Sequence, residues 1–227
     1  MWAVVVAGGS GSRFGRPKQF LELAGRPVIA WSVAAARTVA DGVVVVVPVE
    51  AAGGDPTGPG RPAAADDGRW GADVVVPGGA TRAASVRAGL AAVPGDAGVV
   101  LVHDAARPLA PPALWAAVLD ALAAGGADGV IPVLPVTDTL KRVGDGTVEA
   151  TVDREGLVSV QTPQAFVAAT LRAAHADGAE ATDDAGLLEG LGATVRTVAG
   201  DPRNLKLTHP EDLALARALL PATPVAP

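Results

Sequence analysis

The sequence has 227 residues, of which 49% are hydrophobic and 3% aromatic, and its formal net charge is −6. This length fits a single domain over residues 1–227, with enough apolar content for a core of Ala, Val and Leu. The acidic balance and the lack of a basic tract argue against nucleic acid as a partner. The absence of cysteine excludes disulfides and thiolate metal sites. No apolar run approaches the ~20 residues of a membrane span. The apolar N-terminus has no basic flank, so we expect a cytoplasmic protein without a signal peptide or membrane partner.

The first notable stretch is a glycine-rich loop at residues 7–19, which follows an apolar run predicted to be a buried strand. Four glycines fall within residues 7–15, and such a loop lets backbone N–H groups surround an anion closely. Arg13 and Lys18 add two cations. We therefore predict a polyphosphate-binding loop. The competing interpretation is a flexible glycine loop that only caps a Rossmann-like strand.

Two common phosphate loops do not match this stretch. A Walker A loop requires Gly-Lys-[Ser/Thr], but Lys18 follows Pro17 and precedes Gln19. The dinucleotide fingerprint requires Gly or Ala at its last place, which Phe14 occupies here. The loop therefore calls for a different class of nucleotide site.

Alternating strands and helices follow the loop, the pattern of an α/β fold with a Rossmann-like, mostly parallel sheet flanked by helices. Residues 50–71 are rich in Ala, Gly and Pro and are expected to form a surface connection. Thr182 is the candidate N-cap of its helix, with Asp183 and Asp184 in the first turn. The predicted strands are 2–6, 43–47, 74–76, 99–103, 129–133, 159–161 and 194–198. The predicted helices are 27–39, 81–92, 111–124, 163–176, 182–191 and 210–220.

The alternation is interrupted at residues 136–158, where two strands of alternating polarity flank the turn Gly144-Asp145-Gly146. A hairpin cannot continue a parallel sheet, so we expect it to project as an arm. An isolated hairpin is marginally stable in water. We therefore expect the arm to pack on a second subunit in a homodimer.

One carboxylate is placed where ligands bind in such a fold. Asp104 closes the predicted strand 99–103, and open α/β sheets bind ligands at the carboxyl ends of their strands. Magnesium is held by one or two carboxylates together with phosphate oxygens, so Asp104 is the candidate metal ligand. A helix cap or turn residue is the alternative interpretation. His103 is expected to be structural.

Several motifs resemble the 2-C-methyl-D-erythritol 4-phosphate cytidylyltransferase family of sugar-phosphate nucleotidyltransferases. Residues 7–19 resemble its A-G-G-x-G-x-R-x-G…P-K-Q signature, and residues 103–108 its H-D-A-A-R-P string. Residues 78–86 resemble its G-G-x-x-R-x-x-S-V motif, with Ala80 where some relatives carry an acidic residue. Further similar strings lie at 137–141, 151–154, 161–164, 182–185 and 204–208. Their order over nearly the whole chain, apart from residues 50–71 and the C-terminal tail, makes the resemblance specific.

The resemblance implies transfer of a cytidylyl group from CTP to 2-C-methyl-D-erythritol 4-phosphate, with release of pyrophosphate, Mg²⁺ as cofactor, and a homodimer embraced by the arms. The catalytic residues it implies are Arg13, Lys18, Arg154 and Lys206. The nucleotide-binding residues it implies are Ala7, Gly8, Gly9, Ser10, Gly11, Arg13, Lys18, Gly79, Ala80, Ser85, Asp104 and Ala105. The substrate-binding residues it implies are Asp104, Arg107, Thr139, Arg154, Thr162, Thr182 and Lys206.

The roles of these residues follow a physical pattern. The hydroxyl of Ser85 and the backbone at Gly79 and Ala80 would read the edge of cytosine. Arg154, whose planar fork binds phosphate oxygens in pairs, would grip the methylerythritol phosphate. For Arg154 and its neighbour Thr139, a solvated strand surface is the alternative. For Arg82 the alternative is an ordinary surface position, and for Thr182 it is helix capping.

Two other functions remain open from the residues alone. One is a related enzyme such as a ribitol 5-phosphate cytidylyltransferase. The other is a nucleotide-binding oxidoreductase or a non-catalytic binding module. The oxidoreductase is disfavoured because Val47-Pro48-Val49 stands where an acidic ribose-binding residue is expected, with Glu50 as its substitute.

Overall fold

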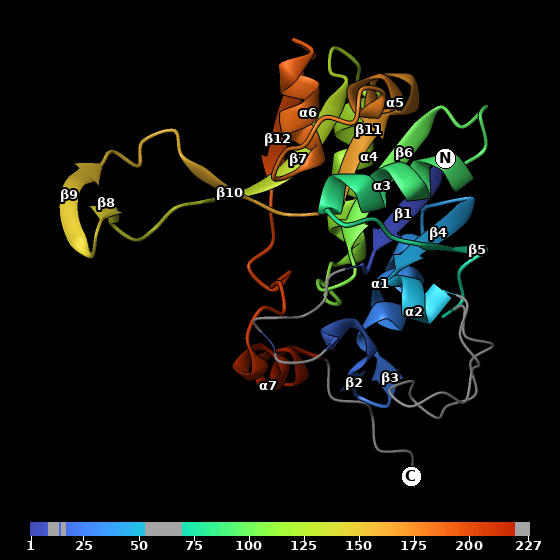
Figure 1. Cartoon of the computed structure of the whole chain (residues 1–227), viewed down its shortest axis with the longest axis horizontal. Helices are drawn as coiled ribbons and strands as arrows, with labels where there is room; N and C mark the ends of the chain where they lie inside the picture. The colour runs from blue at the N-terminus through green and yellow to red at the C-terminus, as the bar shows by residue number, and fades with distance from the viewer. Residues whose placement is uncertain (9–13, 15–16, 53–69, 221–227) are drawn as a thin grey trace.

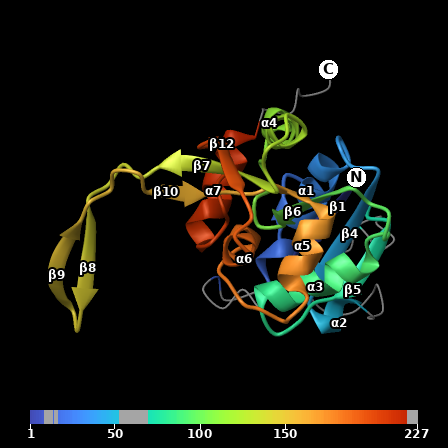
Figure 2. The ribbon, with the colours of Figure 1, turned by 90° about the horizontal axis from the view of Figure 1, so that it is seen from above.

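A computed structural model describes residues 1–8, 14, 17–52 and 70–220 of the chain. Its described part is built around one eight-stranded sheet with helices on both faces (Figures 1 and 2). The strand order is β10-β7-β11-β6-β1-β4-β5, and β12 also pairs with β7. The sheet strands are β1 (Trp2–Val6), β4 (Gly42–Val47), β5 (Val74–Pro77), β6 (Val99–Asp104), β7 (Gly129–Pro135), β10 (Val158–Val160), β11 (Gln164–Val167) and β12 (Val195–Ala199).

Most of the sheet is parallel, which confirms the predicted α/β class. β1 lies between β4 and β6 and is parallel to both, β5 is parallel to β4, and β12 is parallel to β7. Every residue of β4 is buried, because helices cover both faces of a parallel sheet and favour continuous runs of β-branched residues. From β1 the chain builds outward through β4 and β5 and then returns to β6 on the other side of β1. The strand order therefore reverses between β1 and β6, the position where such sheets bind ligands.

Helices lie on both faces of the sheet (Figure 2), and two clusters of buried apolar side chains form the cores between the sheet and these helices. On one face lie α1 (Val28–Ala36) and α4 (Pro112–Ala123), and Trp115 of α4 is the largest fully buried side chain of this core. On the other face lie α3 (Arg82–Ala92), α5 (Ala168–His175) and α6 (Asp184–Gly190).

Helix α3 approaches the sheet closely at Gly89. A Cβ atom there would come within 2.5 Å of Val4 Cγ1 and 2.9 Å of Val46 Cγ2, distances that side chains do not adopt without a shift of their neighbours. The glycine therefore sets how near α3 lies to β1 and β4. The N-terminal end of α3, capped by the Thr81 side chain through the Ala84 N–H, is thereby held beside the carboxyl ends of the strands.

The predicted helix over residues 163–176 is wrong in its first part. Gln164–Val167 instead form β11, which is inserted antiparallel between β6 and β7, and only Ala168–His175 are helical. Its pairing partners are distant in the sequence, and both faces of the strand are covered, so it shows no alternation of polar and apolar residues. The N-cap of α6 is Asp183, whose side chain accepts the Gly186 N–H, and not Thr182 as predicted.

Four short elements were not predicted. They are η2 (Lys18–Phe20), β2 (Glu22–Leu23), β3 (Arg26–Pro27) and α2 (Val49–Ala52). β2, which pairs with β3, packs against α7 (Pro210–Leu219) around a third apolar cluster that contains the buried Leu23 and Leu207. Because Leu207 belongs to this cluster, the segment that leads into α7 has a fixed position.

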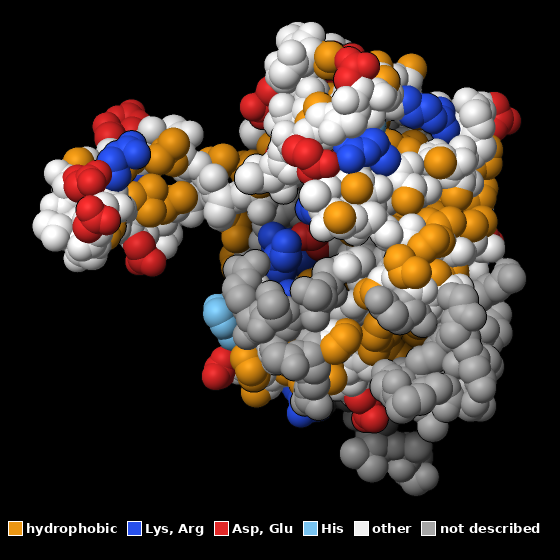
Figure 3. Space-filling model, viewed as in Figure 1, with side chains coloured by type: hydrophobic (Ala, Val, Ile, Leu, Met, Phe, Trp, Pro, Cys, Tyr) orange, Lys and Arg blue, Asp and Glu red, His pale blue; other side chains and the backbone are white. Residues whose placement is uncertain are grey.

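The predicted hairpin is confirmed. β8 (Leu140–Gly144) and β9 (Thr147–Val152) pair antiparallel and extend away from the body of the molecule (Figures 1 and 2). Asp145 and Gly146, with φ of 49° and 75°, form the tight turn, as two-residue hairpin loops require. Val143 and Val148 of this arm are both 57% exposed, and hydrophobic side chains are visible on its surface (Figure 3).

No helix in the described ranges is long and apolar enough to cross a membrane.

Candidate active site

A pocket of about 480 Å³ opens at the carboxyl ends of β1, β5 and β6. This is the edge of the sheet at which the strand order reverses, so the fold itself places the cavity where α/β proteins bind ligands. In the space-filling view, basic and acidic side chains lie together in a hollow near the base of the arm (Figure 3). The predicted site residues that line the pocket are Ala7, Gly8, Lys18, Gly79, Ala80, Ser85, Asp104, Ala105 and Lys206.

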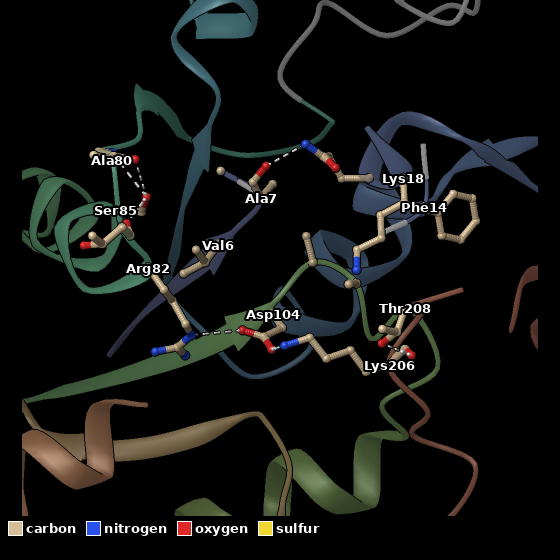
Figure 4. Close-up of a pocket in the computed structure, with 16 residues that line it drawn as sticks. Val6, Ala7, Phe14, Lys18, Ala80, Arg82, Ser85, Asp104, Lys206 and Thr208 are labelled. Carbon is tan, nitrogen blue, oxygen red and sulfur yellow. Dashed lines mark hydrogen bonds and ion pairs between the residues drawn. The ribbon is translucent and has the colours of Figure 1, made fainter. Parts of the chain in front are cut away.

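Asp104 lies between two cations in this pocket (Figure 4). Its Oδ2 is 2.7 Å from Lys206 Nζ, and its Oδ1 is 3.4 Å from Arg82 Nε. Burial opposes the charged form of the carboxyl, but the positive charges of Arg82 and Lys206 outweigh burial. They hold the pKa of Asp104 well below its usual range. The group is therefore a carboxylate at neutral pH and can bind a cation.

Arg82 was missed as a functional candidate from the sequence, because it was assigned no role in the site and an ordinary surface position was allowed for it. The structure places it on the pocket wall, where it bridges Asp104 and the buried Asp184. Burial lowers the pKa of its guanidinium, but the negative charges of Asp104 and Asp184 raise this pKa by a larger amount. The net effect is a raised pKa, so Arg82 stays charged. Its position directly after the helix cap Thr81, beside the glycine pair, was the available signal.

The N-terminal loop is held at its two ends. Gln19 is buried, and its Nε2 donates to the Ala7 carbonyl at 2.8 Å, so η2 is attached to the end of β1. Lys18, which precedes it, extends its side chain into the pocket toward Asp104 and Lys206 (Figure 4). Lys18, the predicted cation of this loop, therefore lines the same pocket as Lys206, the predicted cation near the C-terminus.

The opposite wall is formed by the loop after β5. Ser85 Oγ accepts the Gly79 N–H at 3.1 Å and donates to the Thr81 carbonyl at 2.9 Å, which fixes this loop on the first turn of α3. A Cβ at Gly8 would lie 2.9 Å from Ser85 Oγ, so a larger residue there would displace this hydroxyl from its hydrogen bonds. Ser85 lines the pocket, but its hydroxyl shapes the Gly79 loop in this structure.

A buried histidine supports Asp104 from behind. His103 Nε2 faces the Arg107 carbonyl at 3.1 Å and must carry a hydrogen, so Nδ1 accepts from Thr162 Oγ1 at 3.0 Å. Thr162 Oγ1 in turn accepts the Asp104 N–H at 3.0 Å. Complete burial lowers the pKa of His103 to about 4. The imidazole is therefore neutral and structural, as expected. Thr162, predicted to touch substrate, lies behind Asp104 and does not line the pocket.

The remaining predicted residues lie elsewhere. Arg107 is turned away from the pocket lining and donates to the Asn204 and Val160 carbonyls at 2.7 and 3.3 Å. Thr139 and Arg154 are at the base of the arm, where Arg154 donates to the Thr137 carbonyl. Thr182 is exposed just before α6. Gly9, Ser10, Gly11 and Arg13 lie outside the described residues.

A divalent cation fits the donor chemistry at Asp104. Among the described residues no group of three or more His, Cys, Asp or Glu side chains could enclose a metal by itself. Magnesium does not need such a cage, since it is commonly held by one or two carboxylates and the substrate's phosphates. The ionised Asp104, which lines a pocket that also carries Lys18 and Lys206, satisfies that requirement.

A pocket at the reversal point of the sheet, entered by lysines from both ends of the chain and placed next to a glycine-rich sequence after β1, is typical of a nucleotide-binding enzyme of the nucleotidyltransferase class. Comparison with known proteins agrees with that class. The model of the 2-C-methyl-D-erythritol 4-phosphate cytidylyltransferase family matches residues 1–222. The chain belongs to this family, whose members are cytidylyltransferases of isoprenoid biosynthesis that use CTP and 2-C-methyl-D-erythritol 4-phosphate.

Individual relatives support this membership. The chain is 48% identical to the 2-C-methyl-D-erythritol 4-phosphate cytidylyltransferase of Nocardia farcinica, over 96% of this chain and 93% of the relative. The crystal structure of the Thermus thermophilus enzyme of the same name superposes with a TM-score of 0.77, at 40% identity, covering 95% of this chain and 96% of that chain. The chain is also 45% identical to a bifunctional enzyme IspD/IspF of Solidesulfovibrio magneticus, where it spans 58% of the relative's length.

Proposed function

We propose that the described pocket carries the family's reaction in this chain, the transfer of a cytidylyl group from CTP to 2-C-methyl-D-erythritol 4-phosphate with release of pyrophosphate. The observation that supports this proposal is the convergence of Lys18 and Lys206 on the ionised Asp104 at the carboxyl ends of β1 and β6. The reaction joins two phosphate-bearing anions, so electrostatic repulsion and misorientation form much of its barrier. Preorganised cations lower such a barrier most effectively in a partly enclosed site.

The two walls of the pocket suit the two ends of a nucleotide. Gly8 and Lys18, with the predicted Arg13, would hold the triphosphate, because backbone N–H groups and cations stabilise its charge. Gly79 and Ala80, in the loop fixed by Ser85, would meet the cytosine base. A base read by fixed hydrogen bonds is discriminated strongly, since a wrong base leaves buried groups unpaired.

The attacking group is the substrate's own phosphate, so no covalent enzyme intermediate is required. Lys206 would place that phosphate in line with the α-phosphorus of CTP. Asp104 would hold Mg²⁺ together with the phosphates, and the ion would supply additional charge neutralisation when bound. Lys206 reaches Asp104 on a flexible stem, so it can leave the carboxylate for a phosphate oxygen.

The arm is proposed to complete a homodimer. β8 and β9 pair only with each other among the described strands, and they expose Val143 and Val148. A two-stranded hairpin of this kind gains stability by packing on another surface. Arg154 and Thr139, at the base of the arm, would then act at the pocket of either subunit. Light scattering at micromolar concentration should give twice the monomer mass, and a monomer would contradict this proposal.

We also propose a cytoplasmic location, which the lack of cysteine and the absence of a membrane-spanning helix in the described ranges support. Fractionation of cells that make the protein would test it. Recovery with membranes would count against it.

The activity is tested by incubating the protein with CTP, Mg²⁺ and one alcohol phosphate, and measuring pyrophosphate. Rapid release with 2-C-methyl-D-erythritol 4-phosphate and not with ribitol 5-phosphate is expected. The reverse preference would assign the chain to the alternative cytidylyltransferase. Titration with NADH provides a second control, since tight NADH binding without CTP binding would favour the oxidoreductase. Chelation of Mg²⁺ should abolish release, and full activity in excess chelator would remove the metal from the proposal.

A further inference from the structure

We propose that Arg82 is a positioning residue, which fixes the orientation of the Asp104 carboxylate and leaves Lys206 as the cation that exchanges when ligands arrive. This inference rests on the proposed function of the pocket. Arg82 and Lys206 both pair with Asp104, but their contacts differ, and we assign them different roles.

Arg82 is held by two carboxylates from different parts of the fold, of which Figure 4 shows Asp104. Its Nη1 lies 2.7 Å from Asp184 Oδ2, and its Nε lies 3.4 Å from Asp104 Oδ1. The side chain is 24% exposed. A planar guanidinium bound at two of its edges has little freedom to rotate, so the position of Asp184 is transmitted to Asp104.

Asp184 is itself fixed in place. Its side chain is 1% exposed at the start of α6, and its other oxygen, Oδ1, is 3.0 Å from His175 Nε2 in α5. Both carboxylate oxygens of Asp184 are therefore engaged by side chains that come from separate helices. The chain of contacts from α5 through α6 and α3 ends at Asp104 on β6.

Lys206 is more exposed and more flexible than Arg82. Its side chain is 43% exposed, and it reaches Asp104 Oδ2 through a flexible four-carbon stem. An ammonium on such a stem changes partners at a lower cost than a guanidinium bound at two edges. When a divalent cation or a phosphate enters, Lys206 is the group that leaves Asp104, and Arg82 keeps Oδ1 in place.

Charge balance supports the same division. Asp104 and Asp184 carry two negative charges, and Arg82 and Lys206 carry two positive charges, so the group is neutral without ligand. If a neutral residue replaced Arg82, the buried Asp184 would lose its ion-pair partner. Asp104 would then be paired with Lys206 alone. The carboxylate would then turn toward Lys206, and the lysine would be less available to a phosphate.

The test compares Arg82→Gln and Arg82→Lys with Arg87→Gln as a matched control. Arg87 lies on the same helix and also pairs with the segment before α6, through Glu180, but it does not contact Asp104. Three quantities are measured: kcat with its KM for the alcohol phosphate, the Mg²⁺ concentration for half-maximal velocity, and the calorimetric affinity for CTP with Mg²⁺. Circular dichroism confirms that each variant is folded. Asp184→Asn, which loosens the anchor while keeping Arg82, replaces Arg82→Gln if the latter does not fold.

Loss of a residue that orients a metal-binding carboxylate costs about 10- to 100-fold in activity or metal affinity. We expect Arg82→Gln to lose kcat and to require more Mg²⁺ within that range, with little change in KM for the alcohol phosphate. Arg82→Lys should recover part of the loss, and Arg87→Gln should resemble wild type. The inference is overturned if folded Arg82→Gln keeps its Mg²⁺ requirement and CTP affinity, or if Arg87→Gln loses as much. A wild-type protein that binds CTP without transferring it would contradict the proposed function separately, since the affinities still test Arg82.

Discussion

Replacement of Gly89 by alanine tests whether the close approach of α3 to the sheet is built into the fold. The new Cβ would stand 2.5 Å from Val4 Cγ1 and 2.9 Å from Val46 Cγ2. Both valines are fully buried on central strands, and β-branched side chains have few alternative rotamers. The clash can therefore be relieved only by moving α3 away from β1 and β4.

Two opposing terms set the size of the effect. Alanine is favoured over glycine within a helix by about 1 kcal/mol. Overpacking of a core costs about 1–3 kcal/mol, and two stiff neighbours place this site toward the upper end. We expect the free energy of unfolding to fall by about 1–2 kcal/mol, or the Tm by about 5 °C in a protein of this size.

Gly190→Ala is the matched control, because Gly190 ends α6 and a Cβ there meets nothing within 4 Å. Alanine at that position should be neutral or stabilise the protein by up to about 1 kcal/mol. Urea unfolding of wild type and both variants measures the difference. A Gly89→Ala protein as stable as Gly190→Ala would show that the packing at α3 is not limiting and would refute the reasoning.

Three further predictions concern single side chains. Lys18→Ala should lower turnover in the pyrophosphate assay by about a hundredfold, as loss of one preorganised charge donor does. The exposed Arg203→Ala serves as control, and Lys18→Ala activity within a few-fold of wild type would remove Lys18 from catalysis. Asp183→Ala should lower the free energy of urea unfolding by about 1 kcal/mol through loss of the α6 cap, and an unchanged value would contradict this role. His103 has a folded pKa of about 4, below its usual ~6.5, so the folded state binds fewer protons between these values. Stability should therefore fall by up to about 3 kcal/mol as pH drops from 6.5 to 4, and an equal slope in His103→Asn would exclude this cause.

The central strands and the loop before α3 were predictable because their signals are local. β1, β4 and β6 are short stretches rich in buried valine, and their predicted bounds agree with the structure to within a residue. Asp104 follows directly from its place at the end of such a strand. The glycine pair before α3 likewise lies within a few residues of the helix, which was predicted to begin at Thr81 and begins at Arg82.

The features that were missed depend on partners distant in the sequence. β11 is a strand because β6 and β7 lie on either side of it, and the four residues of Gln164–Val167 do not reveal that pairing. Arg82 was assigned no role because its anchor, Asp184, is 102 residues away. The arm was predicted from its alternating polarity, but its exposed apolar residues become informative only in three dimensions.

Lys206 and Asp104 are also separated by 102 residues, and this separation has a consequence for synthesis on the ribosome. β1, β5 and β6, whose carboxyl ends form the pocket, are synthesised early, whereas α6 and the segment that carries Lys206 are synthesised late. Domains fold as their segments become available during translation. A nascent chain can therefore form β1 and β6 long before Lys206 is available to pair with Asp104, so the pocket is completed only near the end of synthesis.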